Sequence, residues 1–219
     1  MMNLSLTSPA NSHLTVLCLG SHADDVEIGC GGTVLKLIAS GRQVRVGWVV
    51  FSGSEERADE ARASASKFLE GAAEQHVEIK GLRDGFFPYL GYEAKESFEE
   101  LKQRWSPDVI FTHYRDDRHQ DHRLISDLTW NTFRNHLILE YEVPKYDGDL
   151  GSPNVFVHLD EPTCHRKVKG IIDAFQTQRN RHWFTENTFM SLLRLRGIES
   201  ASPEGYAEGF FSRKAVLAP

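Results

Sequence analysis

Long apolar runs are absent from this sequence of 219 residues. No stretch approaches the ~18 consecutive apolar residues of a membrane-spanning helix, so we do not expect a membrane-spanning protein. The first residues, MMNLSLTSPANSH, also lack the basic segment and following apolar stretch of a secretory signal. We therefore expect a cytoplasmic protein.

The sequence also has few cysteines and no excess of positive charge. The three cysteines, Cys18, Cys30 and Cys164, are far apart and form no C-x-x-C, so they predict neither a disulfide framework nor a Cys-based zinc site. We interpret them as small buried hydrophobic residues. The 31 acidic residues exceed the 25 basic ones, and the resulting net charge of -6 disfavours a nucleic-acid surface and favours a small-molecule substrate.

The composition that remains is typical of a globular protein, with 40% hydrophobic and 26% charged residues. A chain of 219 residues is near the upper limit for one hydrophobic core, so we expect a single domain over residues 1–219. Within it we expect residues 1–12 to form a flexible N-terminal segment.

Apolar strands and amphipathic helices alternate along the first half of the chain. Strands are expected at 14–19, 44–51, 76–81 and 108–113, and helices at 26–41, 52–71 and 96–105. This alternation predicts an α/β fold, a doubly wound, mostly parallel sheet with right-handed crossovers and helices on both faces. Further on we expect a fifth strand at 154–159, a helix at 161–178 and, at 141–154, a long loop that shapes a substrate pocket.

Two charged turns follow the first and fourth predicted strands. With the strand order 3-2-1-4-5 these strands are neighbours, and ligands bind beyond their carboxyl ends. The turn SHADD and the stretch HYRDDRHQDHR thus bring together His22, Asp24, Asp25, His119, Asp121 and His122. One histidine or aspartate on a loop is more often a solvated polar residue, but two such clusters at a ligand-binding edge predict a functional site. They suit Zn²⁺ with three protein ligands and an open position, although spacing alone leaves open which carboxylate binds metal and which transfers protons.

The two charged stretches resemble the motifs of a known family. S-H-A-D-D-V-E-I-G-C-G-G-T resembles H-P-D-D-x-E-x-G-x-G-G-T, and H-Y-R-D-D-R-H-Q-D-H resembles a second motif ending in D-x-H-x-D-H, both of the LmbE-like (PIG-L) family of zinc-dependent N-deacetylases. R-A-D-E-A-R-A is similar to the family's R-x-x-E-A helix, and the resemblance extends more weakly over residues 14–215. Ala23 stands where the family usually has proline, which we expect to make the turn more mobile without loss of chemistry.

This resemblance implies a Rossmann-like fold and a hydrolase that removes an N-acetyl group from an amino sugar or an N-acetylglucosamine-type conjugate. It implies that His22, Asp25 and His122 bind zinc. Asp24 would be the general base that deprotonates the metal-bound water and later protonates the leaving amine, and His119 would stabilise the oxyanion. Asp121 would orient His119 from behind.

The resemblance also aligns Arg57 and Glu60, which we treat as candidate substrate contacts. As a merely exposed pair on one helix they would contribute only about a few tenths of a kcal/mol. Asp117 is expected to support the second motif. The glycines of G-C-G-G lack the spacing of a dinucleotide-binding turn and follow two aspartates, so nucleotide binding is disfavoured.

Several alternatives stay open on the sequence alone. The same metal site could serve a zinc-dependent hydratase, or a hydrolase that acts on another carbonyl compound. The chain could also be a noncatalytic sugar-binding protein with a decayed site, although each ligand and proton-transfer position is present. Fe²⁺ or Co²⁺ would accept the same ligands as Zn²⁺. A homo-oligomer is compatible with the sequence, which does not specify the sugar or the acyl length.

Overall fold

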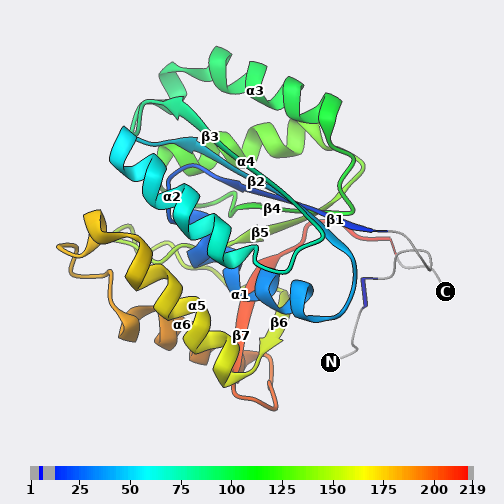
Figure 1. The fold of residues 1–219 in the computed structure, drawn as a ribbon, viewed down its shortest axis with the longest axis vertical. Coiled ribbons are helices and arrows are strands. Elements are labelled where there is room, and N and C mark those ends of the chain that lie inside the picture. Colours follow the sequence, from blue (N-terminus) through cyan, green and yellow to red (C-terminus); the bar gives the residue numbers. More distant parts are fainter. Residues whose placement is uncertain (1–4, 7–12, 217–219) are drawn as a thin grey trace.

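One sheet organises the computed structural model, which describes residues 5–6 and 13–216. The expected N-terminal segment, residues 1–12, therefore lies almost entirely outside the described residues. The sheet has the strand order β3-β2-β1-β4-β5-β7-β6 (Figure 1). The strands are β1 (Leu14–Gly20), β2 (Val44–Ser52), β3 (Glu74–Leu82), β4 (Val109–His113), β5 (Leu137–Tyr141), β6 (Val155–Leu159) and β7 (Tyr206–Phe211). β1 to β5 are parallel to one another, whereas β7 is antiparallel to both β5 and β6.

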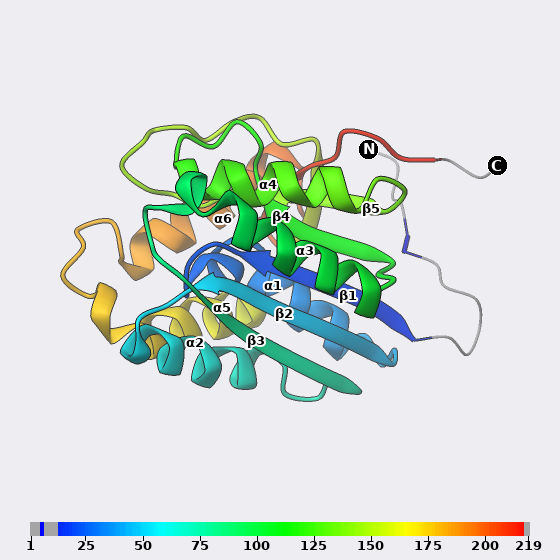
Figure 2. The same ribbon diagram turned by 90° about the horizontal axis from the view of Figure 1, so that it is seen from above.

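Helices cover both faces of the sheet (Figures 1 and 2). They are α1 (Asp25–Ala39), α2 (Glu55–Phe68), α3 (Gly91–Arg104), α4 (Gln120–Thr132), α5 (Glu161–Ala174) and α6 (Glu186–Glu199), with short 3₁₀ helices η1 (Phe87–Tyr89) and η2 (Gln176–Gln178). α1, α2 and α5 pack together on one face, and α3 and α4 pack together on the other. This is the predicted doubly wound α/β fold in a single domain, with a mixed but mostly parallel sheet.

Burial on both faces explains why the central strands read as continuous apolar runs. In β1, Val16 and Cys18 belong to the core beneath α1 and α2, whereas Leu17 and Leu19 belong to the core beneath α3 and α4. Successive side chains of a strand point to opposite faces, so both must be apolar when helices cover both. All three cysteines are buried and unpaired, as predicted.

A buried ion pair between Lys167 of α5 and Glu208 of β7 contacts backbone groups in the middle of α1. The Lys167 ammonium donates to the carbonyl of Ile28 at 2.7 Å and lies 2.6 Å from the Glu208 carboxylate. Glu208 in turn accepts the backbone N–H groups of Gly32 (2.8 Å) and Thr33 (2.7 Å). Residues of α5 and β7 thus satisfy backbone groups within the helix that begins at the candidate site.

The second half of the chain differs from the sequence-based prediction. Residues 154–159 do form a strand, but it is the edge strand β6, and β5 takes the expected place beside β4. β5, α6 and β7 were not predicted. The helix expected at 161–178 ends at Ala174, where η2 follows after one residue.

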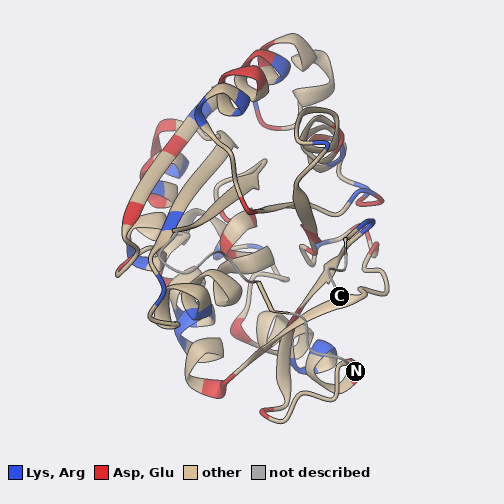
Figure 3. Ribbon diagram, turned by 90° about the vertical axis from the view of Figure 1, so that its right-hand side faces the viewer, with Lys and Arg blue, Asp and Glu red and all other residues tan. Residues whose placement is uncertain are grey.

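The helices of the described residues are too short or too polar to cross a membrane. Their outer faces carry charges of both signs, as α3 at the top of Figure 3 illustrates. On α3, Lys95 pairs with Glu99 one turn further along, an arrangement typical of a solvated helix face.

Candidate active site

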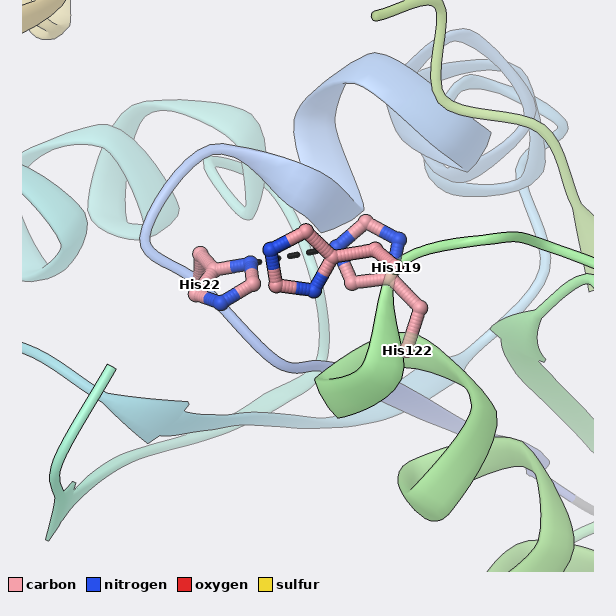
Figure 4. A group of neighbouring side chains, drawn as sticks. All are labelled: His22, His119 and His122. Carbon is pink, nitrogen blue, oxygen red and sulfur yellow. Dashed lines mark hydrogen bonds between the residues drawn. The ribbon is translucent and has the colours of Figure 1, made fainter. Parts of the chain in front are cut away.

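The site lies beyond the carboxyl ends of β1 and β4, which are adjacent in the sheet. His22 belongs to the turn that follows β1, and His119 and His122 belong to the beginning of α4. Figure 4 shows the three imidazole rings gathered at one point, although His22 and His122 are 100 residues apart in the sequence. The topology thus brings together the two charged turns as predicted.

The three expected metal ligands lie at mutual distances that suit a divalent ion. His22 Nδ1 is 3.1 Å from His122 Nε2 and 3.2 Å from Asp25 Oδ2, and His122 Nε2 is 3.5 Å from Asp25 Oδ1. Ligands about 2.0–2.2 Å from a tetrahedral zinc ion are roughly 3.3–3.5 Å from one another. His22, Asp25 and His122 therefore fit such an ion by geometry and by donor type.

The far nitrogens of both histidines are occupied by carboxylates. His22 Nε2 lies 3.2 Å from Asp84 Oδ1 and 3.3 Å from Asp121 Oδ2. His122 Nδ1 lies 2.9 Å from Asp117 Oδ2. Because a carboxylate only accepts hydrogen bonds, these contacts favour a proton on each far nitrogen, which is the tautomer in which the nitrogens that face each other can bind a metal ion.

In the described part of the chain, three overlapping groups bring potential metal ligands close together, and the three expected ligands are distributed among them: His22, His119 and His122; Asp25, His113 and His122; and His22, Asp84 and Asp121. One contains His113, whose ring stacks on His122 at a centroid distance of 3.9 Å and whose Nε2 lies 3.2 Å from Asp25. That nitrogen accepts the backbone N–H of Ser21 at 2.9 Å, so its lone pair is already used. His113 is better suited to hold the turn after β1 than to bind the ion.

Shifted pKa values favour the metal-binding protonation states of two of the three ligands, Asp25 and His122. Burial alone would raise the pKa of Asp25, but His122, His113 and His22 hold it well below its usual value. Burial and repulsion from His113 lower the pKa of His122 to about 3, so its imidazole is neutral near neutral pH. Burial opposes protonation of His22, yet the carboxylates of Asp25 and Asp121 raise its pKa well above its usual value.

Asp24 and Arg57 form a second buried unit beside these ligands. Asp24 precedes α1, is 5% exposed, and accepts a hydrogen bond from Arg57 Nη2 at its Oδ1 (3.0 Å). Burial raises the pKa of Asp24, and the Arg57 guanidinium partly opposes that rise. A carboxylate with a raised pKa suits proton transfer near neutral pH better than an ordinary one does.

His119 and Asp121 are placed differently from the expectation. His119 caps α4 by accepting the Asp121 N–H at its Nδ1 (3.3 Å), so the tautomer with the proton on Nε2 fits this contact. Burial and repulsion from His22 lower the pKa of His119. The Asp121 carboxylate accepts the N–H groups of Gly85 (2.7 Å) and Phe87 (3.1 Å) and contacts His22, rather than His119, its expected partner. The start of α4 turns this side chain toward the loop after β3.

A pocket of about 280 Å³ opens above these groups. Arg57 lines it, but Glu60 does not, because its carboxylate accepts the Thr177 N–H (3.0 Å) and hydroxyl (2.7 Å) and thereby joins α2 to η2. The loop expected to shape the pocket does so with Val143, Lys145, Tyr146 and Asp147. Trp183 also lines the pocket, whereas its neighbour Phe184 belongs to the core.

Sequence reasoning missed three residues near the site. Asp84 follows β3 at the same sheet edge, and His113 is the last residue of β4, so topology offered a signal for both. Lys145 lies within the loop after β5, where no periodic pattern predicts which side chains turn inward. Only its contact with Asp117 shows that Lys145 lies beside the site.

Comparison with known proteins agrees with this geometry. Residues 17–133, just over half of the chain, match the model of the family PIG-L, described as GlcNAc-PI de-N-acetylase. A protein of Escherichia coli K12 described as the uncharacterized deacetylase YaiS is 29% identical over 156 residues, which cover 66% of this chain and 82% of that protein.

Two solved structures share the fold at low sequence identity. The N,N'-diacetylchitobiose deacetylase of Pyrococcus horikoshii has a TM-score of 0.68 and 21% identity, covering 95% of this chain and 86% of that one. GalB of Pseudomonas putida KT2440, a 4-carboxy-2-hydroxymuconate hydratase, has a TM-score of 0.66 and 16% identity, covering 94% of this chain and 98% of that one. The structural matches show the shared fold, and the matched residues, which span both charged turns, show that the chain belongs to the PIG-L family of deacetylases.

Proposed function

We propose that the protein is a zinc-dependent hydrolase that removes an N-acetyl group from an amino sugar or an N-acetylglucosamine-type conjugate. The observation that carries this proposal is the convergence of a buried acid, Asp24, and three potential ligands, His22, Asp25 and His122, on one pocket. Family membership and the deacetylase relatives support the reaction type.

His22 Nδ1, His122 Nε2 and the Asp25 carboxylate would hold the ion. When bound, it would supply Lewis acidity that polarises the acyl oxygen and lowers the pKa of water at the site. Fe²⁺ or Co²⁺ would fit the same donors. The carboxylates that contact the far nitrogens of His22 and His122 would fix the orientation of the two rings. Asp121 would have this role for His22.

Asp24 would act as the general base, since its carboxylate lines the pocket next to the ligands. It would take a proton from the attacking water and pass it to the departing amine, so that the acetyl group leaves as acetate and the sugar as a free amine. Arg57 would hold Asp24 in its ionised form between these steps.

His119 would face the oxyanion. Its Nδ1 is engaged with the backbone of α4, so its Nε2–H is available as a donor to the negative charge that develops on the acyl oxygen. Tyr146 and Trp183 would supply the aromatic surface on which a sugar ring can rest. Glu60 would support the pocket indirectly by holding η2.

The decisive experiment is Asp24→Asn. This variant keeps the size of the side chain but cannot accept a proton, so acetate release from N-acetylglucosamine conjugates should fall by about 10²–10⁴-fold. Its zinc content should equal that of the wild type, because Asp24 is not a ligand. His122→Ala is the matched control, which should lose both metal and activity. Full activity of the Asp24→Asn protein would refute the assignment of the base.

A second candidate is a metal-dependent hydratase or another carbonyl hydrolase using the same site, favoured by the shared fold with the hydratase GalB. Measuring acetate release across a panel of N-acetylated sugars, alongside hydration of unsaturated hydroxy acids, separates the two. Turnover of the acids without acetate from any sugar would favour the hydratase. A purified protein with less than about half a zinc ion per chain, prepared without chelators, would instead favour a noncatalytic binding protein.

A further inference from the structure

The loop that lines the pocket carries a buried lysine. Lys145 follows β5, and only 9% of its side chain is exposed. Its ammonium lies 2.8 Å from Asp117 Oδ2 and 2.7 Å from Asp149 Oδ2, four residues further along the same loop. Attraction to Asp117 and Asp149 outweighs burial and raises the pKa of Lys145, so it is charged near neutral pH. A buried charge of this kind is retained only where its partners hold it closely.

Asp117 is shared between this lysine and the metal site. The oxygen that contacts Lys145, Oδ2, also lies 2.9 Å from His122 Nδ1. The other oxygen accepts the backbone N–H of His119 at 2.7 Å. Lys145 is therefore separated from the metal-facing nitrogen of His122 by one carboxylate and one imidazole ring.

The same contacts fix the tip of the loop, residues 145–150. The base of the loop is held separately, because Arg196 binds the carboxylate of Glu142 (2.6 Å) and the carbonyl of Gly151 (3.0 Å). At the tip, Asp149 accepts the backbone N–H of Arg118 at 2.6 Å. The other polar contact of the tip, between Tyr146 and His182 at 3.1 Å, is exposed to water. Since the contact of Asp149 with Arg118 is exposed as well, the least exposed connection of the tip to the rest of the protein runs from Lys145 to Asp117.

The chain of contacts has an electrostatic consequence. A cation bound at His122 Nε2 withdraws electrons from the ring and strengthens the hydrogen bond from Nδ1–H to Asp117. Asp117 must then be held in one position, and Lys145 is the group that holds its second lone pair. Conversely, loss of Lys145 would leave only the His119 N–H to hold Asp117 in place beside His122, so this contact would be less firmly fixed.

We propose that Lys145 is a positioning residue that couples occupation of the metal site to the position of the loop tip, residues 145–150, beside the pocket. This inference rests on the proposed metal site formed by His22, Asp25 and His122. It assigns to a lysine outside both sequence motifs a part in metal affinity and in the shape of the pocket.

The test compares Lys145→Met with Lys169→Met. Lys169 pairs with Asp173 at the same spacing of four residues (2.8 Å), but it lies exposed on α5, away from the pocket. Competition with a chromogenic chelator would measure zinc affinity. Removing Lys145 should weaken zinc binding about 10–100-fold, as is typical when a group behind a metal ligand is lost. Removing Lys169 should leave the affinity within about twofold of the wild type, since exposed ion pairs of this kind contribute little.

Hydrogen exchange gives a readout independent of activity. Zinc should slow amide exchange at residues 145–150 in the wild type and in Lys169→Met, but not in Lys145→Met. Lys145→Arg should retain part of the protection, because it keeps the charge. If Lys145→Met fails to fold, Lys145→Gln takes its place, because it removes the charge and keeps a polar side chain.

The outcomes distinguish this inference from the proposed function. A wild-type protein that binds no zinc would overturn the metal site and the coupling together. A wild-type protein that binds zinc, beside a Lys145→Met protein with equal affinity and equal protection of the tip, would overturn the coupling alone. Loss of affinity and of protection in Lys145→Met, with neither lost in Lys169→Met, would support it.

Discussion

At the scale of single residues, the histidines of the site differ in the groups that contact their ring nitrogens. The far nitrogens of His22 and His122 contact carboxylates, which favours the tautomer whose facing nitrogens can bind a metal ion. His119 differs because its Nδ1 accepts a backbone N–H, which leaves it a donor. In the proposed mechanism the three histidines of this cluster would therefore serve two different tasks.

The pair of Arg57 and Asp24 leads to a prediction on pH dependence. The guanidinium lowers the pKa of Asp24 against the effect of burial, so Arg57→Met should raise it further. A general base works only when deprotonated, so activity is lost as the pH falls through this pKa. In the variant that loss should set in at a higher pH than in the wild type.

The acid limb of kcat, measured by acetate release at saturating substrate, tests this shift. Arg57→Lys keeps the positive charge and serves as the control, with a smaller displacement. An acid limb that stays in place in Arg57→Met would show that Arg57 does not set the pKa of Asp24. A change confined to KM would indicate a contact with substrate only.

How far the sequence predicts the site depends on where each residue lies. His22, Asp25 and His122 follow strand ends that the apolar pattern locates, so topology brings them together. The partner of Asp121 could not be predicted, because it depends on the direction in which the first turn of α4 points the carboxylate. Asp84 and Lys145 come from irregular loops, whose conformation follows from contacts rather than from periodicity.

At the scale of elements, α1 is the helix that begins at the site, and residues of other elements satisfy backbone groups in its interior. The inserted pair of Lys167 and Glu208 satisfies backbone groups of residues 28, 32 and 33. Close packing adds to this, because a Cβ on Gly29 would lie 2.1 Å from the ring of Tyr141 in β5. The segment G-C-G-G therefore allows helix and sheet to approach closely.

Removing one partner of that pair should be costly. Lys167→Met leaves the Glu208 carboxylate buried without its cation, and breaking such a pair typically costs about 3–5 kcal/mol. The free energy of unfolding in urea would measure the loss. Lys169→Met, on the same helix but exposed, should change it by less than about 1 kcal/mol. Equal values for the two variants would mean that the inserted pair does not stabilise α1.

Irregular apolar patterns explain why β7 and α6 were not predicted from the sequence. β7 carries Glu208 in its middle, and a buried carboxylate interrupts the apolar pattern of a strand. On α6, Leu193 is buried while Leu195 and Ile198 are exposed, so its apolar residues do not form one stripe. β1, β2 and β4, by contrast, are buried on both faces and follow the expected pattern.

At the scale of the whole molecule, the proposed metal site joins two parts of the chain that only the folded sheet brings together. His22 follows β1 and His122 belongs to α4, and an unfolded chain would hold them far apart on average. A ligand that binds the folded state alone stabilises it by an amount that grows with the logarithm of its concentration. Metal binding should therefore be visible in thermal stability as well as in activity.

We expect zinc at 100 times its dissociation constant to add about 2.7 kcal/mol to the free energy of unfolding. For a chain of 150–250 residues this corresponds to a rise in Tm of roughly 5–10 °C, which EDTA should reverse. Differential scanning fluorimetry with and without zinc measures the change. Asp24→Asn should show the full rise, because in the proposed mechanism Asp24 transfers protons and does not bind metal, whereas His122→Ala should show little or none. A rise of equal size in His122→Ala would place the bound zinc elsewhere on the protein, and with it the chemistry assigned to this site.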